Sequence, residues 1–137
     1  MIRFGTGGWR AIIADGFTKR NLQILAYSLA DYMEKNEVQP MEVCIGYDSR
    51  FLSKESAHWI AEVLAARGLL CYMVDRSSPT PLIMFAVKKM ELSFGMAITA
   101  SHNPAIYNGV KVFTKGGCDA NQDITKDLEI LTDQNEH

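Results

Sequence analysis

The feature that most constrains this chain is the regular alternation of two hydrophobic patterns along its 137 residues. Short apolar runs of strand length alternate with longer segments in which apolar residues recur at helical spacing. The strand-like runs cover residues 9–13, 42–47, 69–74, 94–99 and 110–113, and the helix-like segments cover residues 18–36, 53–67, 81–90 and 123–131. Strands that alternate with helices predict a three-layer α/β/α domain around a mainly parallel or mixed sheet. In such sheets, functional residues gather at the carboxyl ends of strands.

The ends of the predicted helices carry residues that suit those positions. Thr18 is placed to act as an N-cap, Thr80 is expected to cap the third helix ahead of Pro81, and Gly68 is placed to end the second helix. The polar tail, residues 132–137, is expected to fray.

Length and composition predict one folded domain and exclude several classes of partner. Apolar residues make up 47% of the chain and charged residues 22%, which are ordinary values for a globular protein. The formal net charge is −2, so no large basic surface is available for nucleic-acid phosphates. No apolar run reaches the roughly 20 residues of a membrane span, and residues 1–10 lack the continuous apolar core of a secretory signal. We therefore expect a cytoplasmic protein with no nucleic-acid or membrane partner.

The sequence around the three cysteines, Cys44, Cys71 and Cys118, favours buried thiols over disulfide or metal roles. Their count is odd, and they show no C-x-x-C spacing. Cys44 and Cys71 lie in apolar segments, where a free thiol acts as a small hydrophobic group.

A stiff polar loop follows the predicted strand at residues 94–99. Ser101 and His102 lie in this loop, and the ring of Pro104 fixes its own φ and restricts Asn103. A rigid loop at a strand end can hold the Ser101 hydroxyl outward. A serine hydrolase is the weaker interpretation, because Ser101 lacks the flanking glycines of the G-x-S-x-G nucleophile elbow. An adjacent histidine does not replace them, since neighbouring side chains generally diverge.

Three segments of the chain resemble the α-D-phosphohexomutase family, which includes the phosphoglucomutases and phosphomannomutases. Residues 99–104 (T-A-S-H-N-P), with N-G-V-K at 108–111, are similar to the phosphoserine loop of that family. Residues 4–10 (F-G-T-G-G-W-R) resemble its opening loop, and residues 46–50 (G-Y-D-S-R) resemble its G-x-D-x-R turn. The resemblance spans nearly the whole chain and implies that residues 1–137 are the first of four domains. The family's magnesium loop, sugar-recognition loop and phosphate-binding domain are not found in this sequence.

The resemblance implies that Ser101 carries a phosphoryl group. Phosphoserine 101 would donate it to a hexose phosphate, and the bisphosphate would reorient and return its other phosphoryl group. The result is interconversion of glucose or mannose 1-phosphate and 6-phosphate through the hexose 1,6-bisphosphate; the hexose itself is not defined by these residues. A phosphoserine carries a charge of about −1.5 to −2, so positive groups are needed beside it. Mg²⁺ is the implied cofactor, with the Ser101 phosphate as one ligand and the others expected from a domain outside this chain.

Phosphate-binding candidates lie in each of the resembling segments. Arg10 offers a planar fork suited to phosphate, against the alternative of a surface arginine, and Gly7 would allow its loop to approach the phosphate closely. Asn103 is a further candidate in the serine loop. For Arg50 two roles stay open: direct contact with substrate phosphate, or a turn in which Asp48 braces the arginine.

His102 and Lys111 are the candidates for handling the proton that the attacking sugar hydroxyl must lose, and Lys111 is also a candidate phosphate-binding cation. The sequence does not say which of them is the base. The structural alternatives are a loop-packing imidazole for His102 and a solvated strand-end lysine for Lys111.

Two functions of different classes remain open from the sequence. The first is the phosphoserine-bearing domain of a phosphohexomutase, an intramolecular phosphotransferase that needs its remaining domains as partners. In that case the chain alone is expected to lack turnover. The second is a non-catalytic phosphosugar-binding or regulatory module of the same fold.

Overall fold

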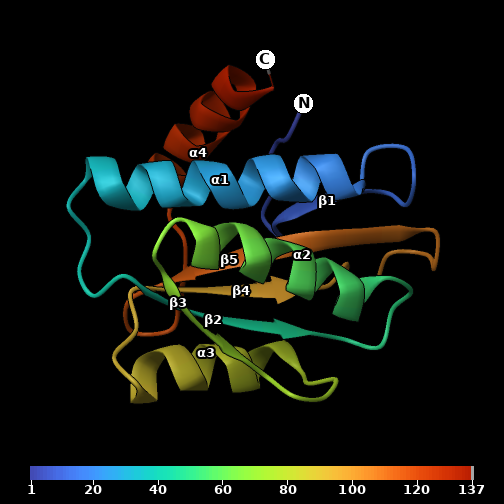
Figure 1. Cartoon of the computed structure of the whole chain (residues 1–137). Helices are drawn as coiled ribbons and strands as arrows, with labels where there is room; N and C mark the ends of the chain where they lie inside the picture. Colours follow the sequence, from blue (N-terminus) through green and yellow to red (C-terminus); the bar gives the residue numbers. More distant parts are fainter. Residues whose placement is uncertain (137) are drawn as a thin grey trace.

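A computed structural model describes residues 1–136, and its elements follow the predicted alternation of strands and helices (Figure 1). The strands are β1 (Trp9–Ile12), β2 (Glu42–Tyr47), β3 (Leu70–Met73), β4 (Phe94–Ile98), β5 (Tyr107–Thr114) and β6 (Cys118–Asp119). The helices are α1 (Lys19–Lys35), α2 (Ser53–Ala66), α3 (Thr80–Lys89) and α4 (Gln122–Asn135). None of these helices is long and apolar enough to cross a membrane.

The sheet is mixed, with strand order β1-β5-β4-β2-β3 and the short β6 paired to β5. β2 pairs in parallel with β3 and β4, whereas β5 runs antiparallel to β1, β4 and β6. The directions of β1, β2, β3 and β4 are therefore the same, and β5 is reversed. As a result, the carboxyl ends of β1, β2 and β4 meet the amino end of β5 at one edge, which we call the carboxyl edge.

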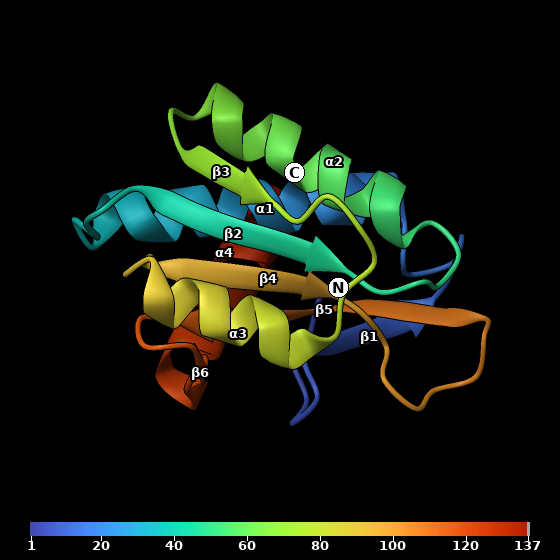
Figure 2. The ribbon, with the colours of Figure 1, turned by 90° about the horizontal axis from the view of Figure 1, so that it is seen from below.

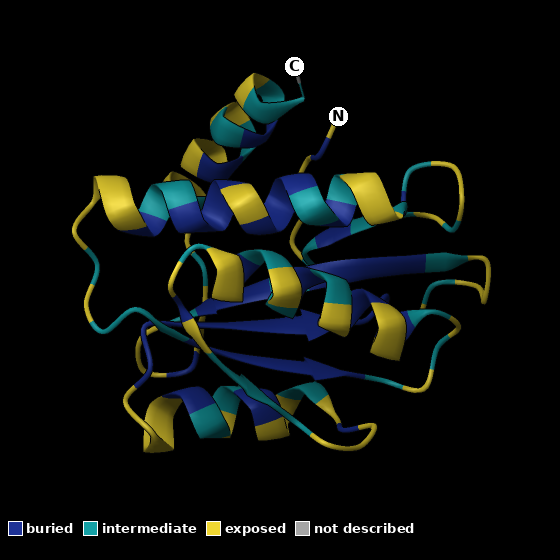
Figure 3. Ribbon diagram, in the orientation of Figure 1, coloured by how far each residue is buried: buried dark blue, intermediate teal, exposed yellow. Residues whose placement is uncertain are grey.

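Helices cover both faces of the sheet, which confirms the three-layer α/β/α prediction. On one face, apolar residues of α1 and α2 such as Leu25 and Ile60 pack with Met96 of β4, and all three are completely buried. On the other face, Ile83 of α3 packs with Phe113 of β5. Figure 2 shows α3 in front of β4, with β1 beyond its end. Figure 3 shows the buried strands between helices whose outer surfaces are exposed.

Two of the three predicted helix signals are confirmed. The Thr18 hydroxyl accepts a hydrogen bond from the Asn21 N–H at 3.1 Å, and Gly68 follows α2 with a φ of +86°. The predicted cap at Thr80 is wrong, because α3 begins at Thr80 itself and the extended residue before it is Pro79.

The chain after β4 differs most from the prediction. β5 is longer than residues 110–113, and β6 was not predicted. The tail was expected to fray, but α4 continues to Asn135. Thr132 is fully buried, and the Asn135 amide donates to the Ser28 hydroxyl at 3.0 Å, so tertiary contacts extend the helix. Residue 137 lies outside the described residues.

All three cysteines are free thiols, but the prediction that they are buried is confirmed only for Cys44 and is wrong for Cys118. Cys44 is buried, Cys71 is partly buried and Cys118 is exposed. Burial raises the pKa of the Cys71 thiol to about 11, which suits a packing role.

Candidate functional site

The loop that contains Ser101 joins the end of β4 to the start of β5 at the carboxyl edge. Ser101 is exposed and has a φ of +53°, in the left-handed region that non-glycine residues rarely adopt. Its backbone N–H donates to the Thr99 hydroxyl oxygen at 3.0 Å, and the Asn103 N–H donates to the Ala100 carbonyl at 3.0 Å. This turn presents the serine to solvent. Strained residues of this kind are concentrated at functional sites.

Arg10 lies beside the same loop, because β1 pairs with β5 and places Arg10 opposite Gly109. Its Nη1 donates to the Asn103 side-chain oxygen at 2.5 Å, and its Nε donates to the Gly7 carbonyl at 3.3 Å. A Cβ atom on Gly7 would lie 2.0 Å from Arg10 Nη2, so a residue with a side chain would displace the guanidinium. The structure therefore brings together Arg10, Gly7 and Asn103, three residues predicted to bind phosphate.

Lys111 lies on the same sheet face as Arg10, two residues along β5 from Gly109. The neighbours Val110 and Val112 belong to the core under α1 and α2. Because side chains alternate along β5, Lys111 points away from α1 and α2, to the face that α3 covers. There its Nζ lies 5.9 Å from the centre of the Phe113 ring. Lys111 pairs with Ala97, which places it farther from the carboxyl edge than Ser101. His102 is exposed next to Ser101.

Arg50 follows β2 and holds the Ser101 loop from one side. Its Nη1 donates to the carbonyls of Pro104 and Tyr107 at 2.8 and 3.0 Å. Its Nη2 donates to the carbonyl of Ser101 at 2.9 Å and makes a further short bond to that of Asn103. All four terminal N–H groups of the guanidinium therefore have acceptors in the loop. These contacts to the loop are neither of the two roles left open for Arg50. The predicted turn in which Asp48 braces Arg50 is present, because Asp48 Oδ1 accepts from the Arg50 backbone N–H and Asp48 Oδ2 lies 3.8 Å from Arg50 Nε. Direct contact of Arg50 with substrate phosphate stays a prediction.

A buried polar network lies behind Arg50. The Asp48 carboxylate accepts hydrogen bonds from the Arg50 backbone N–H at 2.9 Å and from the Ser53 hydroxyl at 2.8 Å. Ser53 Oγ in turn accepts from the Asn108 amide at 2.9 Å, and Asn108 Oδ1 accepts from the Gly109 N–H at 2.8 Å. Ser53 and Asn108 are completely buried. Ser53 was not among the predicted site residues, and Asn108 lay outside the predicted strand at residues 110–113. The sequence feature that could have indicated this network is a pair of polar residues in apolar surroundings.

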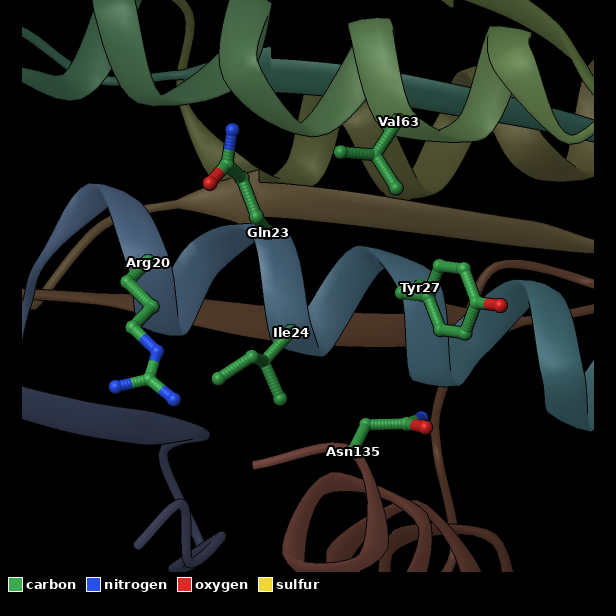
Figure 4. Close-up of a pocket in the computed structure, with 6 residues that line it drawn as sticks. All are labelled: Arg20, Gln23, Ile24, Tyr27, Val63 and Asn135. Atoms are coloured by element: carbon green, nitrogen blue, oxygen red, sulfur yellow. The ribbon is translucent and has the colours of Figure 1, made fainter. Parts of the chain in front are cut away.

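The described residues contain no cluster of three or more His, Cys, Asp or Glu side chains that could hold a metal ion. The assignment of Mg²⁺, with the phosphate of Ser101 as one ligand and the others from a domain outside this chain, stays a prediction. A groove of about 440 Å³ lies between α1, α2 and the end of α4 (Figure 4), and none of the predicted site residues lines it.

The fold and site together define an α/β/α domain that presents a serine on a braced loop beside an arginine. The family model described as phosphoglucomutase/phosphomannomutase, alpha/beta/alpha domain I, matches residues 1–137. The chain belongs to this family, as the resemblance implied.

Known relatives agree with this assignment. A phosphoglucomutase from Staphylococcus haemolyticus is 39% identical over 132 residues, covering 94% of this chain and 24% of the relative. A relative from Schizosaccharomyces pombe, described as a phosphoribomutase, is 41% identical over 122 residues, covering 85% of this chain and 21% of the relative. A Thermus thermophilus structure described as a phosphomannomutase is 36% identical with a TM-score of 0.89, covering 96% of this chain and 30% of that one. The chain thus spans about a quarter of the length of the curated relatives.

Proposed function

We propose that this chain is the phosphoryl-carrying first domain of a mutase that interconverts hexose 1-phosphate and hexose 6-phosphate. The observation that carries the proposal is Ser101, exposed in a left-handed conformation on a loop that Arg50 holds and that Arg10 contacts through Asn103. A loop fixed in this way presents the same oxygen in both halves of a reaction in which phosphate leaves the enzyme and returns. Sugar recognition is assigned to the remaining domains, so the isolated chain is proposed to lack turnover.

The reaction needs positive charge near the serine and a route for one proton. In the forward step the bond between phosphorus and Ser101 Oγ breaks and a bond from phosphorus to the sugar oxygen forms, while the sugar hydroxyl gives up its proton and the leaving Ser101 Oγ takes up a proton to become a hydroxyl. Arg10 is proposed to clamp the phosphate, since its guanidinium already contacts the Asn103 side chain of the loop that carries Ser101. His102 and Lys111 are proposed to orient the hydroxyl and handle the proton. Mg²⁺, when bound to the phosphate, would neutralise part of its charge.

The test of this proposal is the phosphorylation state of Ser101 in the gene product that carries this chain, purified from its own cells. Phosphopeptide mass spectrometry should find phosphate on Ser101, and incubation with a sugar monophosphate should remove it. Ser101→Ala should abolish mutase activity. Ser77→Ala, at an exposed serine on another loop, should leave activity unchanged. Glucose, mannose and ribose phosphates should all be assayed, because the relatives have names that cover more than one sugar.

Three outcomes would contradict the proposal in different ways. Absence of phosphate, together with unchanged activity of Ser101→Ala, would favour the non-catalytic phosphosugar-binding module. Labelling of Ser101 by a fluorophosphonate would favour a serine hydrolase. Turnover of glucose 1-phosphate by the 137-residue chain alone would refute the proposed dependence on further domains.

A further inference from the structure

We infer that Arg50 is a positioning residue, which holds the Ser101 loop in its active shape and makes no contact with the transferred phosphate. This inference rests on the proposed function of Ser101 as the phosphoryl carrier. It assigns the arginine of the G-x-D-x-R turn a role that neither the sequence pattern nor the family description specifies.

The loop is folded around one guanidinium group. The four carbonyls that accept from Arg50 belong to Ser101 and Asn103 within the serine turn, to Pro104 just after it, and to Tyr107, the first residue of β5. One of them is the carbonyl of Ser101 itself, so Arg50 restrains the peptide plane that directly follows the left-handed φ. The charged guanidinium strengthens each of these bonds relative to a neutral donor. Removing it would leave the backbone bonds from the Asn103, Tyr107 and Ile13 N–H groups, the bond from the Ser101 N–H to the Thr99 hydroxyl, and the bond from Arg10 to the Asn103 side chain. Of the bonds that remain among the described residues, none is made to the carbonyl of Ser101.

Arg50 is itself fixed from the side away from the loop. Asp48 Oδ2 lies 3.8 Å from Arg50 Nε, and the other carboxylate oxygen binds the Arg50 backbone and Ser53. Through Ser53 and Asn108 this network joins the end of β2, the first residue of α2 and the start of β5. These three elements are rigid parts of the fold. The guanidinium therefore fixes the backbone of Ser101 relative to the carboxyl edge of the sheet.

A lysine cannot replace this arginine in the same role. A guanidinium directs its donors in a fixed planar fork, whereas an ammonium offers three donors from a single atom. Two of the four carbonyls accept from Nη1 and the other two accept from Nη2. Arg50→Lys therefore keeps the charge but loses the geometry, which separates positioning from simple electrostatic attraction to phosphate.

The experiment compares Arg50→Lys and Arg50→Gln with the wild-type gene product, and uses Arg67→Gln as the matched control. Arg67 also forms ion pairs, with Asp31 and Glu34, but it lies at the opposite end of α2. Hydrogen exchange of residues 100–107 should be at least about tenfold faster in both Arg50 variants and unchanged in the control. The kcat should fall at least about tenfold, while KM for the hexose phosphate stays within about threefold.

A phosphorus NMR titration separates positioning from direct contact with the phosphate. The pKa of phosphoserine 101 should stay unchanged in Arg50→Lys and rise in Arg10→Gln, since removal of a contacting cation disfavours the doubly charged phosphate. A raised phosphate pKa with unchanged loop exchange in the Arg50 variants would overturn the inference, as would wild-type exchange and kcat in Arg50→Lys. If the wild-type protein carries no phosphate on Ser101, the proposed function fails, and the exchange comparison still decides whether Arg50 holds the loop. Arg50→Lys supplies the result if Arg50→Gln does not fold.

Discussion

Gly109→Ala should destabilise the fold at the junction between the sheet and the candidate site. A Cβ atom on Gly109 would lie 2.0 Å from the Trp9 carbonyl oxygen, whereas real Cβ contacts are almost never under 3.0 Å, so the two strands must separate by at least about 1 Å. β1 lies at the end of the sheet and depends on four residue pairs with β5. Weakening two or three of the backbone hydrogen bonds between β1 and β5, at about 1 kcal/mol each, together with the strain of the close contact, should lower the free energy of unfolding by about 2–4 kcal/mol.

The assay is urea or thermal unfolding of the purified chain, and Gly68→Ala is its matched control. At Gly68 a Cβ would meet nothing within 4 Å, so only the left-handed φ of +86° is unfavourable, at about 1 kcal/mol. The midpoint temperature should fall by about 6–15 °C in Gly109→Ala and by about 3 °C in Gly68→Ala. Equal losses in the two variants would refute the reasoning, because they would show that the close strand approach costs nothing beyond a generic glycine effect.

Three further predictions concern features away from the serine loop. Thr18→Ala should lower stability by about 1 kcal/mol in urea unfolding, because it removes the cap on α1. The hydrogen bond from Arg3 lowers the pKa of the Asp133 carboxyl, so this pair stabilises the fold at pH values well above 3.8 and the effect is lost on acidification. The difference in urea midpoint between wild type and Asp133→Asn should therefore shrink as the pH falls below 3.8. Peptide mapping after iodoacetamide treatment of the native protein at pH 8 should find Cys118 modified and Cys71 intact, because burial keeps the Cys71 thiol protonated.

The order and type of the main elements could be predicted because each carries its own local pattern. The run at Glu42–Tyr47 is bounded by turn residues and was predicted at its observed limits. The reversed direction of β5 is not visible in its sequence, since periodicity records which residues are buried and not which way a strand runs. The length of α4 could not be predicted either, because Thr132 and Asn135 are polar and look like tail residues in the sequence. The structure buries Thr132 and joins Asn135 to Ser28 of α1.

The residues of the candidate site could be predicted from the sequence, but the hydrogen bonds between them could not. The sequence placed Ser101, Asn103 and Arg10 in loops or at strand ends, and the structure joins the last two by a hydrogen bond between residues 93 positions apart. Such a contact depends on the strand order, which no local pattern encodes. The role of Arg50 was undecided for the same reason, because its four acceptors lie 51 to 57 residues further along the chain.

The two arginines beside Ser101 are fixed by different parts of the sheet, so they should respond differently to damage. Arg50 follows β2, an interior strand of the sheet, and is tied through Asp48 to the buried pair of Ser53 and Asn108, whereas Arg10 belongs to β1, the outermost strand. Opening of β1 would move Arg10 away from Asn103 but would leave the bonds from Arg50 to the loop intact. Gly109→Ala should therefore reduce phosphoryl transfer through loss of Arg10, and hydrogen exchange of residues 100–107 should rise less than in Arg50→Lys. The two effects differ because of the strand order. The backbone shape of the loop depends on Arg50 after β2, whereas the cation proposed to bind the phosphate is Arg10 on β1.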